Sequence, residues 1–263
     1  QQPMQHAEYL QAEQLAQVNP LIHPQFRHAM YFPQIANVRN PRLLQSMIGY
    51  LKQHPKVEFI EHCPIEQFNI VNGKVQSIRS QNKQIYFADQ FVITTGAWSK
   101  HWSEQLDLDI PVQPVQGQMV LFKTPENWLP TMCMNKVMYL IPRLDGHVVC
   151  GSSMANCGFD TTPTAATKQT ILEACFEMVP ELAAFPIVKQ WAGLRPSSPT
   201  GVPYIGKMPE LDNVWANFGH FRNGLCMGPA SARLLRQLIL KQPTFLDPTA
   251  FCPTRLTTNT LTT

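Results

Sequence analysis

Several features that would assign this sequence of 263 residues to a specialised class are missing from it. No apolar run approaches the roughly 18 residues needed to cross a bilayer, and the polar, Gln-rich stretch 1–17 does not read as a signal peptide. Charged residues make up only 15% of the chain, the formal net charge is +3, and long blocks of like charge do not occur. We therefore expect neither a membrane nor a nucleic acid as a partner.

Cysteine and glycine also lack informative patterns. The seven cysteines are dispersed and form no C-x-x-C pair, which predicts free thiols, a cytoplasmic protein and no metal site. The thirteen glycines nowhere form G-x-G-x-x-G, the motif with which a strand–helix turn binds a dinucleotide pyrophosphate. The first residue is Gln1 rather than Met, so we expect the protein to begin upstream.

What is present indicates a mixed fold of one large domain or two smaller ones. Asn72-Gly73 predicts a tight hairpin turn. Asn40 and Pro41 predict the N-cap and first residue of a helix, and the tail 243–263 is expected to lie loosely on the surface. Apolar spacing predicts further helices over 5–18, 164–179 and 229–240, and strands over 57–60, 65–70, 75–78, 85–87, 91–93, 110–122, 137–141 and 147–151.

Two segments rich in glycine and proline each contain a single arginine. Arg195 lies in 191–206, whose composition predicts a shaped backbone and not a simple strand. Arg222 lies in 219–229, which leads into a predicted helix, so free N–H groups there suit an anion or an electron-rich ring edge. The stretch 190–245 contains only two acidic residues, and a buried arginine suits a carboxylate ligand. The alternative is that both are ordinary surface arginines.

Two other residues attract attention only in combination with these segments. Tyr139 stands at the end of a predicted strand, and Met154 follows the strand that ends at Gly151. Taken singly, a strand tyrosine and a loop methionine are more often packing residues than site residues.

In order along about residues 18–242, seven motifs resemble those of the glycine oxidase branch of the D-amino-acid oxidase family. A single one would be weak, whereas their order along the chain makes the resemblance specific. The motifs are Val92–Ser99, Pro114–Met119, Tyr139–Arg143, Gly151–Met154, Gly158–Asp160, Trp191–Pro196 and Gly219–Gly224.

The resemblance implies a role for each site residue. Arg195 would clamp the substrate carboxylate, the hydroxyl of Tyr139 would help to hold it, and Met154 would line the pocket over the flavin. Ile65 would lie near a backbone contact to adenine. The flavin ring and the strand that passes it would be met by Gly96, Ala97, Trp98, Gly219, Arg222, Asn223, Gly224 and Leu225.

The implied reaction is FAD-dependent oxidative deamination of glycine or a small D-amino acid or secondary amine. Its partners are the amino acid and oxygen, and its products are the oxo acid, ammonia and hydrogen peroxide. The protein would supply placement and electrostatics while the cofactor supplies the redox chemistry. The resemblance also implies a link to thiazole synthesis for thiamine, and a homo-oligomer is left open.

The implied fold combines α/β and α+β parts: a Rossmann-like, incomplete FAD-binding domain interleaved with an antiparallel-sheet substrate domain. We expect the substrate domain over 1–40 and 101–195, the remainder of the FAD-binding domain over 41–100 and 196–242, and a tail over 243–263. Two departures from the family pattern are the missing glycine motif and Thr200, where the family usually has Asp. The second puts the choice of substrate in doubt more than the fold.

Two alternatives stay open. A sarcosine oxidase or a D-amino-acid dehydrogenase would use the same kind of site with another amine or another electron acceptor. A flavin-free, truncated paralogue acting as a binding subunit would explain the missing glycine motif.

Overall fold

The computed structural model describes residues 6–258 and divides them into two compact units. Unit 1 comprises the described residues up to Met47 together with Gln116–Gly193. Unit 2 comprises Ile48–Val115 and the described residues from Leu194 onward. Which unit binds substrate and which binds flavin, and the domain boundaries drawn above, stay predictions.

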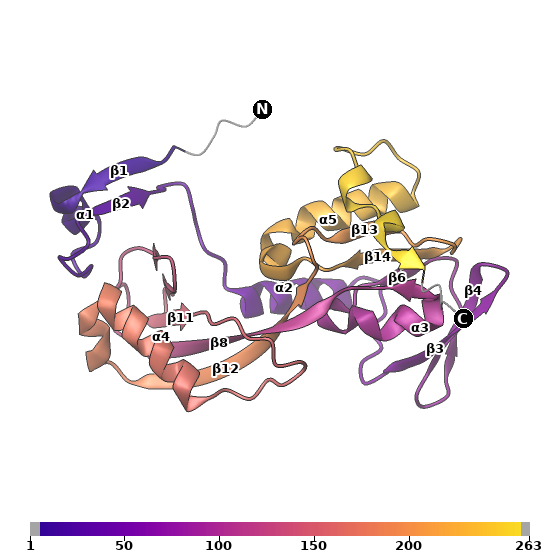
Figure 1. Cartoon of the computed structure of the whole chain (residues 1–263), viewed down its shortest axis with the longest axis horizontal. Coiled ribbons are helices and arrows are strands. Elements are labelled where there is room, and N and C mark those ends of the chain that lie inside the picture. Colours follow the sequence, from indigo (N-terminus) through magenta and orange to yellow (C-terminus); the bar gives the residue numbers. More distant parts are fainter. Residues whose placement is uncertain (1–5, 259–263) are drawn as a thin grey trace. The chain divides into compact units, whose positions relative to one another are not determined.

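Unit 1 is built on a five-stranded sheet in the order β12-β8-β11-β10-β9. Strands β8, β11, β10 and β9 pair antiparallel in that order, and helix α4 (Ala165–Met178) packs against the sheet (Figure 1). Strands β1 (Glu8–Gln11) and β2 (His28–Tyr31) pair as a separate antiparallel unit, and helix α1 (Ala12–Val18) lies in the connection between them. The sheet strands are β8 (Gln113–Lys123), β9 (Cys133–Met134), β10 (Tyr139–Pro142), β11 (His147–Gly151) and β12 (Ile187–Ser197).

The core of unit 1 lies between this sheet and α4. Alternate residues of a strand point to opposite faces, and the face toward α4 is almost completely shielded from water. Its members Val120, Phe122, Leu140, Val148 and Cys150 are each at most 1% exposed, and α4 contributes Ile171, Cys175 and Met178. Helix α4 is capped by Thr164, whose hydroxyl accepts a hydrogen bond from Thr167 N.

Unit 2 contains a three-stranded sheet in the order β13-β14-β6, in which β14 runs antiparallel to β13 and parallel to β6. Helix α5 covers one face through Leu234 and Leu235, and the other face packs on a small antiparallel sheet. The bounds are β6 (Phe91–Ile93), β13 (Tyr204–Lys207), β14 (Val214–Phe218) and α5 (Gly224–Ile239), with the second sheet formed by β3 (Ile65–Val71), β4 (Lys74–Ser80) and β5 (Ile85–Tyr86).

Short elements complete the described chain. Helix α2 (Asn40–Lys52) spans the division between the units and buries none of its residues. Helix α3 (Ser103–Leu106) precedes β7 (Leu108–Asp109), which pairs with β15 (Thr257–Thr258).

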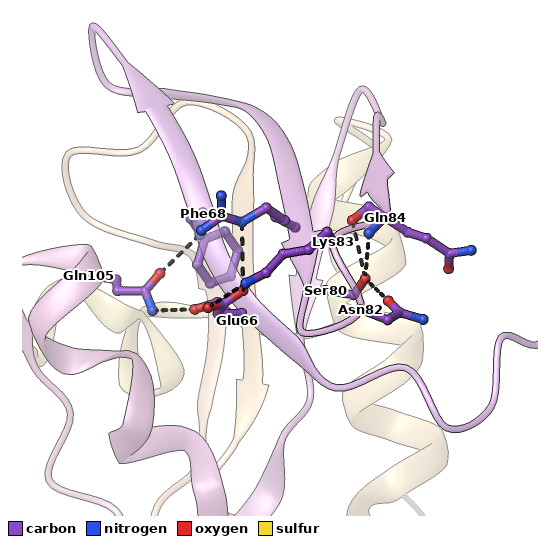
Figure 2. A network of polar contacts seen from close by, with 8 residues as sticks. Glu66, Phe68, Ser80, Asn82, Lys83, Gln84 and Gln105 are labelled. Carbon is purple, nitrogen blue, oxygen red and sulfur yellow. Dashed lines mark hydrogen bonds and ion pairs between the residues drawn. The ribbon is translucent and has the colours of Figure 1, made fainter.

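The outer edge of β3 is occupied by the side chain of Gln105 (Figure 2). Its amide nitrogen donates to the Glu66 carbonyl at 2.8 Å, and its amide oxygen accepts from Phe68 N at 2.9 Å. These two bonds imitate the pairing of a neighbouring strand. The side-chain carboxylate of Glu66 accepts a hydrogen bond from Lys83 Nζ at 2.9 Å.

The predicted mixture of α/β and α+β parts with antiparallel sheets is confirmed. The hairpin at Asn72-Gly73 is also confirmed: both residues have positive φ, 50° and 72°, and Val71 pairs with Lys74. Helix α2 begins one residue earlier than predicted, because Leu43 N donates to Arg39 O and Arg39 therefore occupies the capping position.

Two predictions near the start of the chain are wrong. The first part of the helix predicted over 5–18 is strand β1, because residues 8–11 pair with β2; residue 5 lies outside the described residues. Residues 57–60 form no strand, since no described strand pairs with them, and Phe59 and Ile60 are 41% and 49% exposed.

Three predictions in the second half are also wrong. Residues 191–197 are a regular part of β12 in spite of their glycine and proline. Helix α5 begins at Gly224, so Pro229 stands inside the helix and not at its start. The tail is not loose over its described part, because Pro253 and Leu256 are buried and β15 pairs with β7.

Candidate functional site

In unit 1, three neighbouring strands bring Met119, Gly151 and Tyr139 into one row on the sheet face opposite α4. Tyr139 is paired with Gly151, and Gly151 is paired with Met119. The Tyr139 hydroxyl donates to Met119 Sδ at 3.1 Å. A Cβ at Gly151 would lie 2.8 Å from that sulfur and 3.5 Å from the hydroxyl. Glycine at this position therefore allows the tyrosine and the methionine to approach each other.

Met154 lies just beyond this row, on a segment that runs beside β8. Its two chain neighbours are both bonded to that strand: Gln118 N donates to Ser153 Oγ at 2.9 Å, and Ala155 forms an antiparallel bridge with Gln116. The Met154 side chain is 59% exposed. Its backbone is thus fixed while its side chain stays accessible.

In unit 2, two loops leave the sheet at the same edge. Because β6 and β14 are parallel and Ile93 pairs with Ala216, their carboxyl ends lie together. Gly96, Ala97 and Trp98 follow β6, and Gly219 follows β14. The crevice at the carboxyl ends of parallel strands is where α/β sheets bind ligands. The two segments predicted to meet the flavin therefore share one edge.

The backbone at this edge requires glycine. Gly96 and Gly219 have φ of +57° and +80°, a region that other residues rarely adopt. A Cβ at Gly219 would also lie 3.3 Å from the Tyr204 ring. Ala97 is buried at 2% exposure, whereas the Trp98 side chain is 56% exposed.

After Gly219 the chain forms a short 3-10 turn, Phe221–Asn223, and then helix α5. Arg222 and Asn223 are exposed on this turn, and the first helical N–H groups belong to Gly224 and Leu225. The side chain of Asn223, at the N-cap position, makes no capping hydrogen bond to the helix.

His220 anchors this turn. Its Nε2 lies 3.0 Å from Ser231 Oγ on α5, and its backbone forms an antiparallel bridge with Ser197 at the end of β12. Burial lowers the pKa of His220 below its usual value, so the ring is neutral near pH 7. The turn that bears Arg222 is therefore held to both α5 and β12.

The remaining predicted site residues are placed as follows. Arg195 is a half-buried residue of β12 in unit 2, two positions before the strand ends. Ile65 begins β3 in the small antiparallel sheet and packs against the core of unit 2. Met119, Gly151 and His220 were not predicted as site residues, although each lies within one of the seven motifs.

Within residues 6–258, no group of three or more His, Cys, Asp or Glu side chains is arranged to hold a metal ion. None of the helices in that range is long and apolar enough to cross a membrane. All seven cysteines are free thiols.

The fold is a mixed α/β fold with one candidate arrangement on a sheet face of unit 1 and another at a sheet edge of unit 2. A family model described as DAO, FAD dependent oxidoreductase, matches residues 1–238. The chain belongs to this family, and the predicted resemblance is confirmed.

Two similar curated proteins are named glycine oxidase. The chain is 42% identical to the glycine oxidase of Pseudomonas putida over 89% of its own length, and 40% identical to that of Pseudomonas aeruginosa over 87%. It spans 64% and 62% of the length of these two curated relatives. The crystal structure of glycine oxidase from Geobacillus kaustophilus matches with a TM-score of 0.89 at 24% identity, covering 96% of this chain and 68% of that one.

Proposed function

We propose that this chain supplies the substrate-binding part and one portion of the flavin-binding part of an FAD-dependent oxidase of glycine or a small D-amino acid. The observation that carries the proposal is the shared edge of β6 and β14, where Gly96–Trp98 follows one strand and Gly219–Leu225 follows the other. The names of the two Pseudomonas relatives support glycine as the substrate.

The residues at this edge fit the ring part of FAD. Left-handed glycines leave room for a flat group to approach the backbone, and the start of the 16-residue helix α5 offers N–H donors and positive dipole to an electron-rich ring edge. In the proposed arrangement Arg222 and Asn223 also face the ring, and Ile65 lies near the adenine. A pyrophosphate loop of the glycine-rich kind is not among the residues of this sequence.

In the proposed reaction the protein mainly binds and orients the substrate. Arg195 pairs with the substrate carboxylate, which suits the planar fork of a guanidinium. Tyr139 donates to the same carboxylate, exchanging the weak thioether acceptor of Met119 for a charged oxygen. Met154 lines the pocket and limits the size of the amine. No side-chain base is needed if the amine arrives neutral.

The chemistry that FAD would supply when bound is acceptance of a hydride from the substrate α-carbon and transfer of the electrons to oxygen. The overall products are the oxo acid, ammonia and hydrogen peroxide. A 29% identical relative is named Bifunctional protein ThiO/ThiG. From that likeness we propose thiazole synthesis for thiamine as the pathway. Seven free thiols favour the cytoplasm as the compartment.

The first test is the visible absorption spectrum of the purified chain after addition of FAD, and then of glycine without oxygen. We expect bands of bound flavin that bleach with glycine. Re-oxidation by oxygen with release of peroxide identifies an oxidase, whereas reduction of a dye alone identifies a dehydrogenase. A chain that leaves added FAD unbound would favour the flavin-free binding subunit instead.

Replacement of the proposed carboxylate ligand is the second test. Arg195→Ala should raise the Michaelis constants for glycine and D-alanine about a hundredfold, because a paired, charge-assisted fork is lost. Arg27→Ala, at an exposed position of unit 1, removes the same charge and should leave both constants unchanged. Equal constants in the Arg195 variant and the parent would refute the assignment.

A further inference from the structure

The face of β8 that packs toward α4 contains two amides among apolar side chains. Gln116 and Gln118 precede Val120 and Phe122 on that face, and they are only 3% and 2% exposed. Buried amides are costly unless every donor and acceptor is used. Their hydrogen bonds therefore show what the two residues do.

Both amides bond to the chain beyond Met154. Gln116 Nε2 donates to Asp160 O at 2.7 Å, and Gln118 Oε1 accepts from Thr164 N at 2.9 Å. The two are joined to each other, since Gln118 Nε2 donates to Gln116 Oε1 at 2.9 Å. Gln190 on β12 adds a donor to Gln118 Oε1 at 3.2 Å and another to Thr164 O at 3.0 Å.

The backbone of the same two residues holds the other end of the segment. Gln116 N donates to Ala155 O at 2.9 Å, and Ala155 N donates to Gln116 O at 3.0 Å. Gln118 N donates to Ser153 Oγ at 2.9 Å. Two residues of β8 thus tie down the segment 152–164, which connects β11 to the cap of α4, on both sides of Met154.

We propose that Gln116 and Gln118 are positioning residues that hold the segment 152–164 against β8 and thereby determine which amines fit beside Met154. The selectivity part of this proposal rests on the proposed function. Apolar side chains would continue the packing of Val120 and Phe122 equally well, whereas a satisfied amide network specifies one arrangement of the segment. The proposal also gives a role to the motif Gly158–Asp160, which the proposed reaction leaves unused, and to two residues of the motif Pro114–Met119 besides Met119.

Hydrogen exchange of the whole chain tests the positioning role without any cofactor. Gln118→Met and Gln116→Met keep the side-chain volume but remove the side-chain amide groups. We expect the backbone N–H groups of Ser153, Ala155 and Thr164 to exchange about tenfold faster, with no change in the core strand β11. Gln169→Met, at an exposed position of α4, is the matched control and should change neither.

Two results would overturn the positioning role: unchanged exchange over 152–164, or equal acceleration throughout unit 1, which is the mark of a general loss of stability. If Gln118→Met fails to fold, Gln190→Met removes only the two outer bonds. That variant should accelerate exchange at Thr164 and leave Ala155 unchanged.

The selectivity part needs the chain loaded with FAD. We expect Gln118→Met to change the ratio of kcat/KM for glycine to that for D-alanine by about threefold or more, with an unaltered flavin spectrum. An unaltered ratio, with faster local exchange, would overturn the selectivity part alone. A parent chain that binds no FAD would overturn the proposed function, while the exchange result would still decide the positioning role.

Discussion

The two faces of the five-stranded sheet in unit 1 are built for different purposes from the same strands. Toward α4, alternate residues such as Phe122 and Leu140 are at most 1% exposed. On the opposite face Met119 and Tyr139 are only half buried, and the tyrosine hydroxyl has a thioether as its acceptor. One face is closed by packing, and the other keeps a strong donor on a weak partner that a ligand can replace.

This difference teaches that stability and binding can be separated on one sheet. Substitutions of the apolar residues on the closed face, away from the Gln116 and Gln118 network, should change the free energy of unfolding, and substitutions on the opposite face should change ligand affinity. The three predictions below test that separation, beginning with the largest expected effect.

Phe122→Ala should lower the free energy of unfolding of unit 1 by about 3–5 kcal/mol, since it empties a site in a core that cannot collapse fully. Phe122 is 1% exposed and meets the Phe176 ring edge-on at 6.1 Å. Urea unfolding measures the change. Leu144→Ala, at a residue that is 87% exposed in the same unit, should alter it by less than about 0.5 kcal/mol.

Tyr139→Phe should leave the free energy of unfolding nearly unchanged and weaken carboxylate binding roughly tenfold, because one charge-assisted hydrogen bond is lost. The measurement is the dissociation constant of a substrate-like carboxylate in the FAD-loaded chain. Tyr9→Phe, at an exposed tyrosine of unit 1, removes a hydroxyl elsewhere and should have no effect. A large loss of stability in the Tyr139 variant would show that the two faces are not separable.

Asp145→Asn should have the smallest effect, because the site lies at the edge of the sheet, in the turn between β10 and β11. The pKa of Asp145 is lowered from its usual 3.8 to about 2, mainly by the hydrogen bond with His147 and then by the one with Arg39. A carboxyl whose pKa is depressed by folding stabilises the fold above its ordinary pKa, and the contribution is lost as pH falls from 3.8 toward 2.

The expected size is below about 1 kcal/mol, since the Asp145 side chain is 43% exposed and solvent screens its pairs. Unfolding of parent and variant compared at pH 7 and near pH 2 measures it: the difference should be fully present at pH 7 and mostly lost near pH 2. Asp89→Asn, at an exposed position of unit 2, is the control for loss of a charge. A difference that persists in acid would mean that the asparagine disturbs packing instead.

Elements with strong local signals were predictable from sequence. The apolar run Phe91–Ile93 forms the parallel strand β6, and Asn72-Gly73 forms a hairpin turn. Each of these signals is contained within a few consecutive residues. Residues 57–60 have the composition of a strand but pair with nothing among the described residues. Residues 8–11 have the spacing of a helix but pair with β2. Long-range pairing decided both, and local spacing does not encode it.

The site divides in the same way. The motifs identified Arg195, Tyr139 and the two glycine loops through their resemblance to a family. That β6 and β14 are neighbours, which brings Gly96 and Gly219 to one edge, depends on strands more than a hundred residues apart. The amide network of Gln116 and Gln118 was equally hidden, since its bonds reach Asp160 and Gln190.

The bonds that Gln105 makes along β3 have a consequence for the behaviour of many copies in solution. An open strand edge offers its amides and carbonyls to any extended chain that collides with it, which is how sheets grow from one molecule to the next. At Glu66 and Phe68 those groups are already taken by a side chain that cannot itself extend the sheet. Gln105 thus blocks the addition of another strand to this part of β3.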